Sequence, residues 1–266
     1  MIPFLPKSAA AARITRVAAL LLSLSSAVPV LVRAAEPVLI AAGNDASEGM
    51  ALAAELRTAR PNQSFTNAAV LHRRGADGRR TQIPIRIQTL VPQTGDDWTV
   101  VYRAEPSGAL GGQTLTLHHR PGSTPTREVL RDGAATAVTA GPEESFAGSD
   151  FSVSDLALEF LHWPGQKIIR RDRPEMRKGR PCRILESTRP AGSTSNGGPV
   201  RVKSWIDLEH KQPLMAEAYD ARGTLIKAFS VGSVKKVDGV WKLKDLEIVD
   251  EQAGTLTRLE FDWTVQ

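Results

Sequence analysis

The sequence predicts a mainly β fold of the α+β type, with antiparallel strands that follow one another along the chain and two short helices. Two observations support the strands. Apolar and polar residues alternate with a period of two over much of residues 83–264, which is typical of half-buried strands. Short Gly- and Asp-containing segments separate these runs, and loops this short join strands that pair antiparallel. A third observation, two stretches with apolar residues at helical spacing, supports the helices.

The first predicted element is a helix over residues 47–59. Asn44 or Asp45 can cap it, because such a side chain accepts a hydrogen bond from a free N–H group of the first helical turn. Its apolar stripe consists of Met50, Leu52, Ala53 and Leu56. A helix with one apolar stripe buries it against another element, and Pro61 ends this helix.

Three strands follow the helix and are joined by turns near residues 95–97 and 111–112. The first strand has Ile83, Ile85, Ile87 and Val91 on one face. The second has Trp98, Val100, Tyr102 and Ala104 on one face. The third has Leu115, Leu117 and His119 on one face. Successive short connections predict that these strands form an antiparallel meander.

Residues 120–148 are rich in Pro, Gly, Ser, Thr and Ala, so we expect a loop that holds one short strand at 127–131. A second helix is predicted over residues 152–162. The Ser152 hydroxyl can cap the first turn of this helix, and the Asp155 side chain can bond to the backbone N–H of Ser152. This is a capping box in which the shorter Asp takes the place of Glu. The apolar stripe of this helix consists of Val153, Leu156, Ala157 and Phe160.

The rest of the chain is predicted to be strands at 167–171, 181–188, 200–208, 213–220, 224–234, 240–249 and 255–264. Hairpin turns are expected at 220–223 and at Asp238-Gly239, and a Ser- and Gly-rich loop at 190–199.

Residues 1–34 have the pattern of a secretory signal peptide. Basic residues at positions 7, 13 and 16 precede an apolar run over 17–32 that is short for a membrane span, and Val32-Arg33-Ala34 is a suitable cleavage site. An anchor that is never cleaved stays open as an alternative. The pattern indicates export to the periplasm and leaves residues 35–266, which we expect to form a single domain.

The net charge of +5 comes largely from the N-terminal segment. Four of the 34 basic residues and none of the 29 acidic residues lie in positions 1–34, so the remainder has a net charge of about +1. A nucleic-acid partner is therefore not expected, since such binding depends on excess positive charge. The single cysteine, Cys182, cannot form an internal disulfide and is expected to be a small buried residue.

No catalytic or metal-binding constellation stands out in the sequence. His118 and His119 are neighbours in a predicted strand, so their rings point to opposite faces and cannot share one metal. Asp150 and Asp155 are explained by the start of a helix, where negative charge is favoured. Neither a phosphate-binding loop nor a GxSxG motif is present. We therefore expect no cofactor, no metal and no enzymatic activity, although an enzyme with a dispersed site stays open.

Residues 145–265 resemble the outer-membrane lipoprotein-sorting proteins, the LolA-like family. The matching pieces are the Gly148-Ser-Asp-Phe-Ser segment with Asp155-Leu156, the Trp205-Ile-Asp207 strand followed by Pro213, and the turn at 220–223. The first half of the chain matches only in the order of one helix and then strands. The resemblance implies a curved antiparallel sheet in a half-open β-barrel, LolA/LolB-like and covered by two or more short helices. It also implies an apolar cavity that holds acyl chains, and it supplies no catalytic residues.

We expect one face of the central strands to line that cavity, with the second helix closing it. The expected lining, a lipid-binding hypothesis, consists of Ile85, Ile87, Val100, Tyr102, Leu115, Leu117, Phe160 and Trp163. The strand residues of this set alternate with residues that need water, such as Arg86 and Arg103.

The resemblance and the exported β-rich pattern together indicate a monomeric periplasmic carrier. It would sequester lipid acyl chains or lipoproteins for transfer toward the outer membrane, with membrane-bound donor and acceptor proteins as partners. A lipid- or lipoprotein-sensing regulatory domain of the same fold stays open as an alternative.

The cleavage site leads to the first prediction, that the exported protein begins near Ala35. Intact-mass analysis or N-terminal sequencing of protein recovered from the periplasm measures this directly. Recovery of chains that retain Met1 would contradict it and favour the uncleaved anchor.

Overall fold

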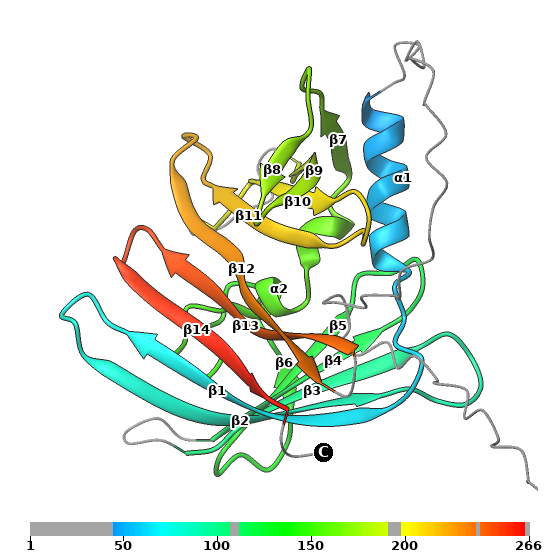
Figure 1. The fold of residues 1–266 in the computed structure, drawn as a ribbon. Coiled ribbons are helices and arrows are strands. Elements are labelled where there is room, and N and C mark those ends of the chain that lie inside the picture. The colour runs from blue at the N-terminus through cyan, green and yellow to red at the C-terminus, as the bar shows by residue number, and fades with distance from the viewer. Residues whose placement is uncertain (1–44, 107–111, 191–197, 238–239, 264–266) are drawn as a thin grey trace, which may run out of the picture.

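The computed structural model describes residues 45–106, 112–190, 198–237 and 240–263, whose fold is shown in Figure 1. Several predicted features lie outside the described residues. These are the signal peptide at 1–34, Asn44, Gly111, the turn at 238–239 and most of the loop at 190–199.

The sequence folds into fourteen strands and three short helical segments within the described ranges. The first half contains α1 (Asp45–Arg57), β1 (Phe65–Arg74), β2 (Arg80–Leu90), β3 (Trp98–Ala104), β4 (Gln113–His119), β5 (Thr126–Arg131), β6 (Val138–Thr139), α2 (Val153–Leu156) and the 3-10 helix η1 (Glu159–His162). The second half contains β7 (Gly165–Ile169), β8 (Glu175–Arg177), β9 (Arg180–Thr188), β10 (Arg201–Asp207), β11 (Pro213–Tyr219), β12 (Leu225–Val237), β13 (Val240–Asp250) and β14 (Thr255–Asp262).

All of these strands belong to one antiparallel sheet with the order β6-β5-β4-β3-β2-β1-β14-β13-β12-β11-β10-β9-β7, and β8 pairs with β9. Two meanders, β1 to β6 and β9 to β14, therefore lie side by side, and the first strand of the chain, β1, pairs with the last, β14. The sheet curves strongly, with α2 inside the curve and α1 beside β7 at one end (Figure 1). The prediction of a curved antiparallel sheet covered by short helices is confirmed, and each predicted strand is present within a few residues of its expected ends.

Strand β1 was not predicted from the sequence. It lies between β2 and β14 and is the element that connects the two meanders. Its buried face carries Asn67, Ala69 and Leu71, of which one is polar and one is small. The usual alternation of large apolar and polar residues is therefore too weak to identify this strand.

The prediction of one continuous helix over residues 152–162 is wrong. The chain forms α2 and η1 instead, and Leu158 between them has a left-handed backbone with φ of 48°. This conformation is costly for a residue with a side chain, and it redirects the chain between the two helical segments. The predicted capping box is confirmed, because Ser152 and Asp155 cap each other's backbone N–H groups.

Helix α1 packs on the sheet through Leu52, Ala53 and Leu56, which form a buried cluster with residues of η1, β7, β9 and β10. Met50 was expected in this stripe, but its side chain is 52% exposed. The helix instead approaches the sheet at Gly49. A Cβ atom added there would lie 2.4 Å from the Cα atom of Lys167 in β7, so the two backbones pack with no room for a side chain.

This close approach leads to a prediction for Gly49→Ala. An Ala in a helix normally stabilises relative to Gly, but here the added methyl group must displace the β7 backbone. We expect the free energy of unfolding in urea to fall by about 1–3 kcal/mol. Met50→Ala, at the exposed neighbouring position, should change it by less than about 0.5 kcal/mol. A stabilised Gly49→Ala protein would contradict the close packing.

Candidate functional site

An apolar cavity lies between the inner face of the curved sheet and the segment that contains α2 and η1. Side chains from both meanders form its walls. The lining on β1 to β3 consists of Phe65, Asn67, Ile87, Thr89, Val100 and Tyr102. The lining on β10 to β14 consists of Val202, Pro213, Ala216, Ala218, Lys227, Phe229, Leu246, Ile248, Leu259 and Phe261. The remaining lining residues are Phe151, Asp155, Leu156, Leu158 and Phe160, and we call the segment 150–160 that carries them the roof.

The cavity has a volume of about 130 Å³, and with its open mouth the atom-free space is about 1120 Å³. Among its many apolar lining residues only Asp155 and Lys227 are charged. A cavity of this composition excludes ions and favours apolar groups, because each buried apolar surface releases water.

The structure places the predicted lining residues in two environments. Ile87, Val100, Tyr102 and Phe160 line the cavity. Ile85, Leu115 and Leu117 lie on the same sheet face but are fully packed in the core, and Trp163 is also buried outside the lining. The role of these residues in binding a lipid stays a prediction.

The segment that precedes α2 explains why part of the expected lining is covered. Phe146 packs edge-on against Tyr102 with ring centroids 5.9 Å apart. The backbone N–H of Ala147 donates to the Gln113 side chain on β4. This segment therefore covers the inner face over β4 and part of β3, and the cavity is lined by the rest of β3, by β1 and β2, and by the second meander.

The wall that β10 to β14 contribute was not predicted from the sequence. These strands have the required alternation, but the alternation alone does not say which face points inward. Register shifts on β10, β11 and β12 complicate it further, because a bulge moves the following residues to the other face.

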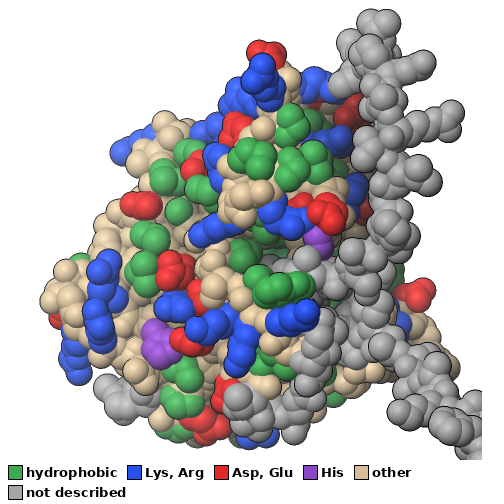
Figure 2. Space-filling model, viewed as in Figure 1, with side chains coloured by type: hydrophobic (Ala, Val, Ile, Leu, Met, Phe, Trp, Pro, Cys, Tyr) green, Lys and Arg blue, Asp and Glu red, His purple; other side chains and the backbone are tan. Residues whose placement is uncertain are grey.

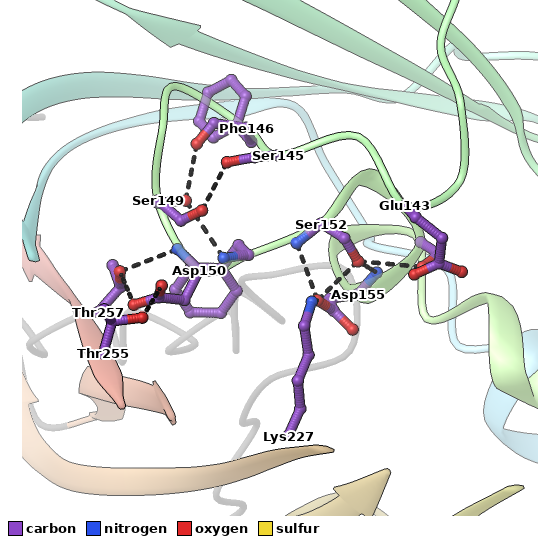
Figure 3. Close-up of polar contacts among 12 residues, drawn as sticks. Glu143, Ser145, Phe146, Ser149, Asp150, Ser152, Asp155, Lys227, Thr255 and Thr257 are labelled. Atoms are coloured by element: carbon purple, nitrogen blue, oxygen red, sulfur yellow. Dashed lines mark hydrogen bonds and ion pairs between the residues drawn. The ribbon is translucent and has the colours of Figure 1, made fainter. Parts of the chain in front are cut away.

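Two sets of polar contacts hold the roof against the sheet (Figure 3). The first is centred on Asp150, whose carboxylate accepts hydrogen bonds from the hydroxyls of Thr255 at 2.6 Å and Thr257 at 2.7 Å. The Asp150 backbone N–H also donates to the Thr257 hydroxyl at 3.0 Å. Asp150 is thus fully engaged in positioning the segment on β14, and this role differs from the one expected for it at the start of a helix.

The second set joins the roof to β12. The Lys227 ammonium donates to Asp155 Oδ2 at 2.7 Å, and the same carboxylate accepts from the Ser152 backbone N–H at 2.8 Å. The Lys227 and Asp155 side chains are 17% and 25% exposed. This ion pair lies in an otherwise apolar wall, so it fixes one end of the roof over the cavity.

Glu143 lies near this ion pair (Figure 3). Burial raises the pKa of its carboxyl, and the negative charge of Asp155 raises it further, whereas Arg189 and Lys227 oppose this. The Arg189 guanidinium donates to Glu143 at 3.2 Å and also lies over the ring of Trp163. Trp163, expected in the cavity lining, is therefore held in this charged network.

A smaller niche of about 30 Å³ adjoins the cavity and shares Val100 and Tyr102 with it. Its polar residues are Arg57, His119 and His162. The imidazole of His119 stacks on Trp98 with ring centroids 4.6 Å apart. Burial lowers the pKa of both histidines to about 4, so both rings are neutral near pH 7.

The described residues contain no group of three or more His, Cys, Asp or Glu side chains that could hold a metal ion. Cys182 is buried, as expected, and burial raises the pKa of its thiol, so it is a poor nucleophile. Within the same ranges, none of the helices has the length and apolar character needed to cross a bilayer.

Comparisons with known proteins give a family and a fold. A family model described as an uncharacterised protein matches residues 95–265. No curated protein sequence matches the chain. The structure is similar to that of a DUF1329 family protein from Desulfovibrio piger, with a TM-score of 0.66 and 17% identity over 83% of this chain and 92% of that one.

Two further solved structures are similar. One is a domain from Vibrio parahaemolyticus named for outer membrane lipoprotein sorting, with a TM-score of 0.65 and 19% identity over 83% of this chain and 95% of that one. The other is a LolA superfamily protein from Nitrosomonas europaea, with a TM-score of 0.56 and 16% identity over 82% of this chain and 92% of that one. At these identities the likeness establishes the fold.

The buried histidines lead to a prediction about pH. The folded state keeps His119 neutral down to about pH 4, whereas an unfolded chain protonates it near pH 6.5. Its contribution to stability is therefore complete above pH 6.5 and is lost as the pH falls toward 4. His119→Phe retains a flat ring against Trp98 but cannot titrate.

We expect the wild-type free energy of unfolding to fall between pH 7 and pH 5 by about 1–2 kcal/mol more than that of His119→Phe. Urea unfolding at the two pH values measures the difference. Identical pH dependence in wild type and His119→Phe would contradict the burial of a neutral His119.

Proposed function

The chain belongs to the family whose model matches residues 95–265 and has a LolA-like fold, and we propose that it is a periplasmic carrier of lipid acyl chains or lipoproteins. It would hold acyl chains in the apolar cavity and release them for transfer toward the outer membrane. The observation that carries the proposal is the cavity itself, whose walls are apolar on both meanders and whose mouth is open.

The physical reason for such a carrier is the cost of exposing acyl chains to water. Burial of each CH₂ group contributes about 0.8 kcal/mol, so even a partly enclosed chain is strongly held. The wall offers aromatic and aliphatic surface, for example Phe229, Ile248 and Phe261. This role does not require a reaction centre. The carboxylates of Asp150 and Asp155 instead hold the roof in place through hydrogen bonds to β14 and an ion pair with Lys227.

The cavity must widen to accept a whole chain. Its volume of about 130 Å³ resembles that of an engineered cavity that admits benzene and is below the range of about 300–1,000 Å³ for ligand pockets. We infer that the roof moves outward on binding and that the first bond to break joins Asp155 to Lys227.

The composition of the roof supports this motion. Leu156, Leu158 and Phe160 face the cavity but are only partly buried, so their displacement costs less than that of a core residue. The left-handed backbone of Leu158 marks a strained joint between α2 and η1.

Two measurements test the proposal. Mass spectrometry of organic extracts from exported protein purified without detergent should detect co-purified acyl lipids. Titration with a fluorescent fatty acid should show saturable binding. Failure of both would remove the carrier hypothesis and leave the fold without an assigned role.

A matched pair of variants tests whether the cavity is the binding site. Ala216 lines the cavity on β11, whereas Ala228 on β12 lies between Lys227 and Phe229, which face inward, and therefore faces the other side of the sheet. Ala216→Trp should lower the affinity for the fluorescent fatty acid at least about tenfold, which corresponds to the loss of roughly two buried CH₂ groups. Ala228→Trp should leave the affinity within about twofold. Equal effects of the two substitutions would place the probe elsewhere.

A further inference from the structure

The hairpin formed by β12 and β13 extends beyond its neighbouring strands. β11 pairs with β12 only as far as Ser230, and β14 pairs with β13 only from Asp245 onward. β12 and β13 continue to pair with each other as far as Val237 and Val240. Residues 233–237 and 240–244 therefore form a two-stranded ribbon outside the main sheet, which we call the basic ribbon.

The basic ribbon is rich in lysine. Its cationic residues are Lys235, Lys236, Lys242 and Lys244, of which Lys244 pairs with Glu260 of β14 at 3.7 Å. Lys235 is the register partner of Lys242, and like charges opposite each other destabilise a strand pair. In the space-filling view, Lys and Arg side chains lie beside hydrophobic and acidic ones on the face that carries β12 to β14 (Figure 2).

Large apolar side chains are exposed on the same ribbon. Trp241 is 42% exposed and Val234 is 40% exposed, whereas the other four tryptophans are all less than 9% exposed. Trp241 pairs with Lys236, so an exposed indole and an ammonium group lie side by side on one face. Such a combination suits a surface that is anionic at the outside and apolar just beneath.

The end of the basic ribbon that joins the main sheet lies next to one end of the cavity. The Lys242 ammonium is 4.7 Å from the centroid of the Trp263 ring, and Trp263 stacks on Phe261 with ring centroids 5.8 Å apart. Phe261 lines the cavity. A surface that contacts the ribbon would therefore lie close to the cavity wall at β14.

We propose that the basic ribbon docks the protein on an anionic membrane surface. Lys235 and Lys236 contact phosphate groups of the lipid headgroups, and Trp241 and Val234 enter the boundary between headgroups and acyl chains. The exposed apolar residues favour a bilayer over a nucleic acid, for which charge alone would suffice. This docking goes beyond the proposed function, because it does not require the cavity to bind lipid.

The test measures co-sedimentation of the exported protein with phosphatidylcholine vesicles and with vesicles that also contain phosphatidylglycerol. Wild type should bind the anionic vesicles, and high salt should weaken binding because it screens the lysines. The double substitution Lys235→Glu and Lys236→Glu should lower the partition coefficient about tenfold or more. Tryptophan emission should shift to shorter wavelength on binding, and Trp241→Ser should abolish the shift.

The matched control is Arg79→Glu with Arg80→Glu, which changes the net charge equally. These exposed residues lie at the β1–β2 turn, which is near Gly254 at the other end of β13 from the basic ribbon. The control pair should bind vesicles within about twofold of wild type. Circular dichroism confirms that both double variants are folded.

Three outcomes would overturn the docking proposal: no binding of wild type to the anionic vesicles, equal losses in the ribbon and control variants, or binding to DNA without binding to the vesicles. The fluorescent fatty acid separates this proposal from the carrier function. The Lys235→Glu, Lys236→Glu variant should bind that probe in solution like wild type, so loss of vesicle docking and loss of cavity binding are independent results.

Discussion

The antiparallel pairing of β1 with β14 is the contact on which the rest of the sheet depends. Leu71 lies opposite Leu259, and Ala69 lies opposite Phe261. On the other side of β1, Leu71 lies opposite Ile83 of β2 and Ala69 lies opposite Ile85. Because side chains alternate between faces, a slip of one residue in this pair would turn one meander's apolar face outward. The two cavity walls face each other only because this register is kept.

The roof shows how polar groups specify position inside a mainly apolar interior. A buried carboxylate is costly unless it is paired and hydrogen-bonded, and both roof carboxylates satisfy this condition. Asp150 is held by two threonine hydroxyls, and Asp155 is held by Ser152 and Lys227. Directional contacts of this kind define a single position for the segment, whereas apolar contacts alone would allow several packings.

The fold could be predicted from the sequence to the extent that each element carries its own signal. The strands of the second meander and helix α1 have a clear period, and their ends were found within a few residues. β1 could not be found, because its inner residues are small or polar and its place is set by strands from both halves. The break at Leu158 was also invisible, since helix propensity does not reveal a left-handed backbone imposed by tertiary packing.

The candidate site was predictable only in part. The alternation of side chains between the two faces of a strand was enough to identify Ile87, Val100 and Tyr102 as inward-facing, and the structure places them in the cavity lining. The same alternation could not show that Leu115 and Leu117 are covered by the segment that precedes α2, because that segment is a loop without periodicity. The opposite wall required the pairing of distant strands and the bulges within them, neither of which a single sequence displays.

The position of β1 has a consequence for how the chain folds. A ribosome completes this strand early, yet its partner β14 is almost the last segment to be made. Until β14 arrives, β1 is an edge strand with Leu71 uncovered, and such edges invite pairing with other chains. Contacts between distant segments also form slowly. The two arginines at the end of β1, Arg73 and Arg74, place charge on this temporary edge and would discourage association of chains whose last strand has not yet been made.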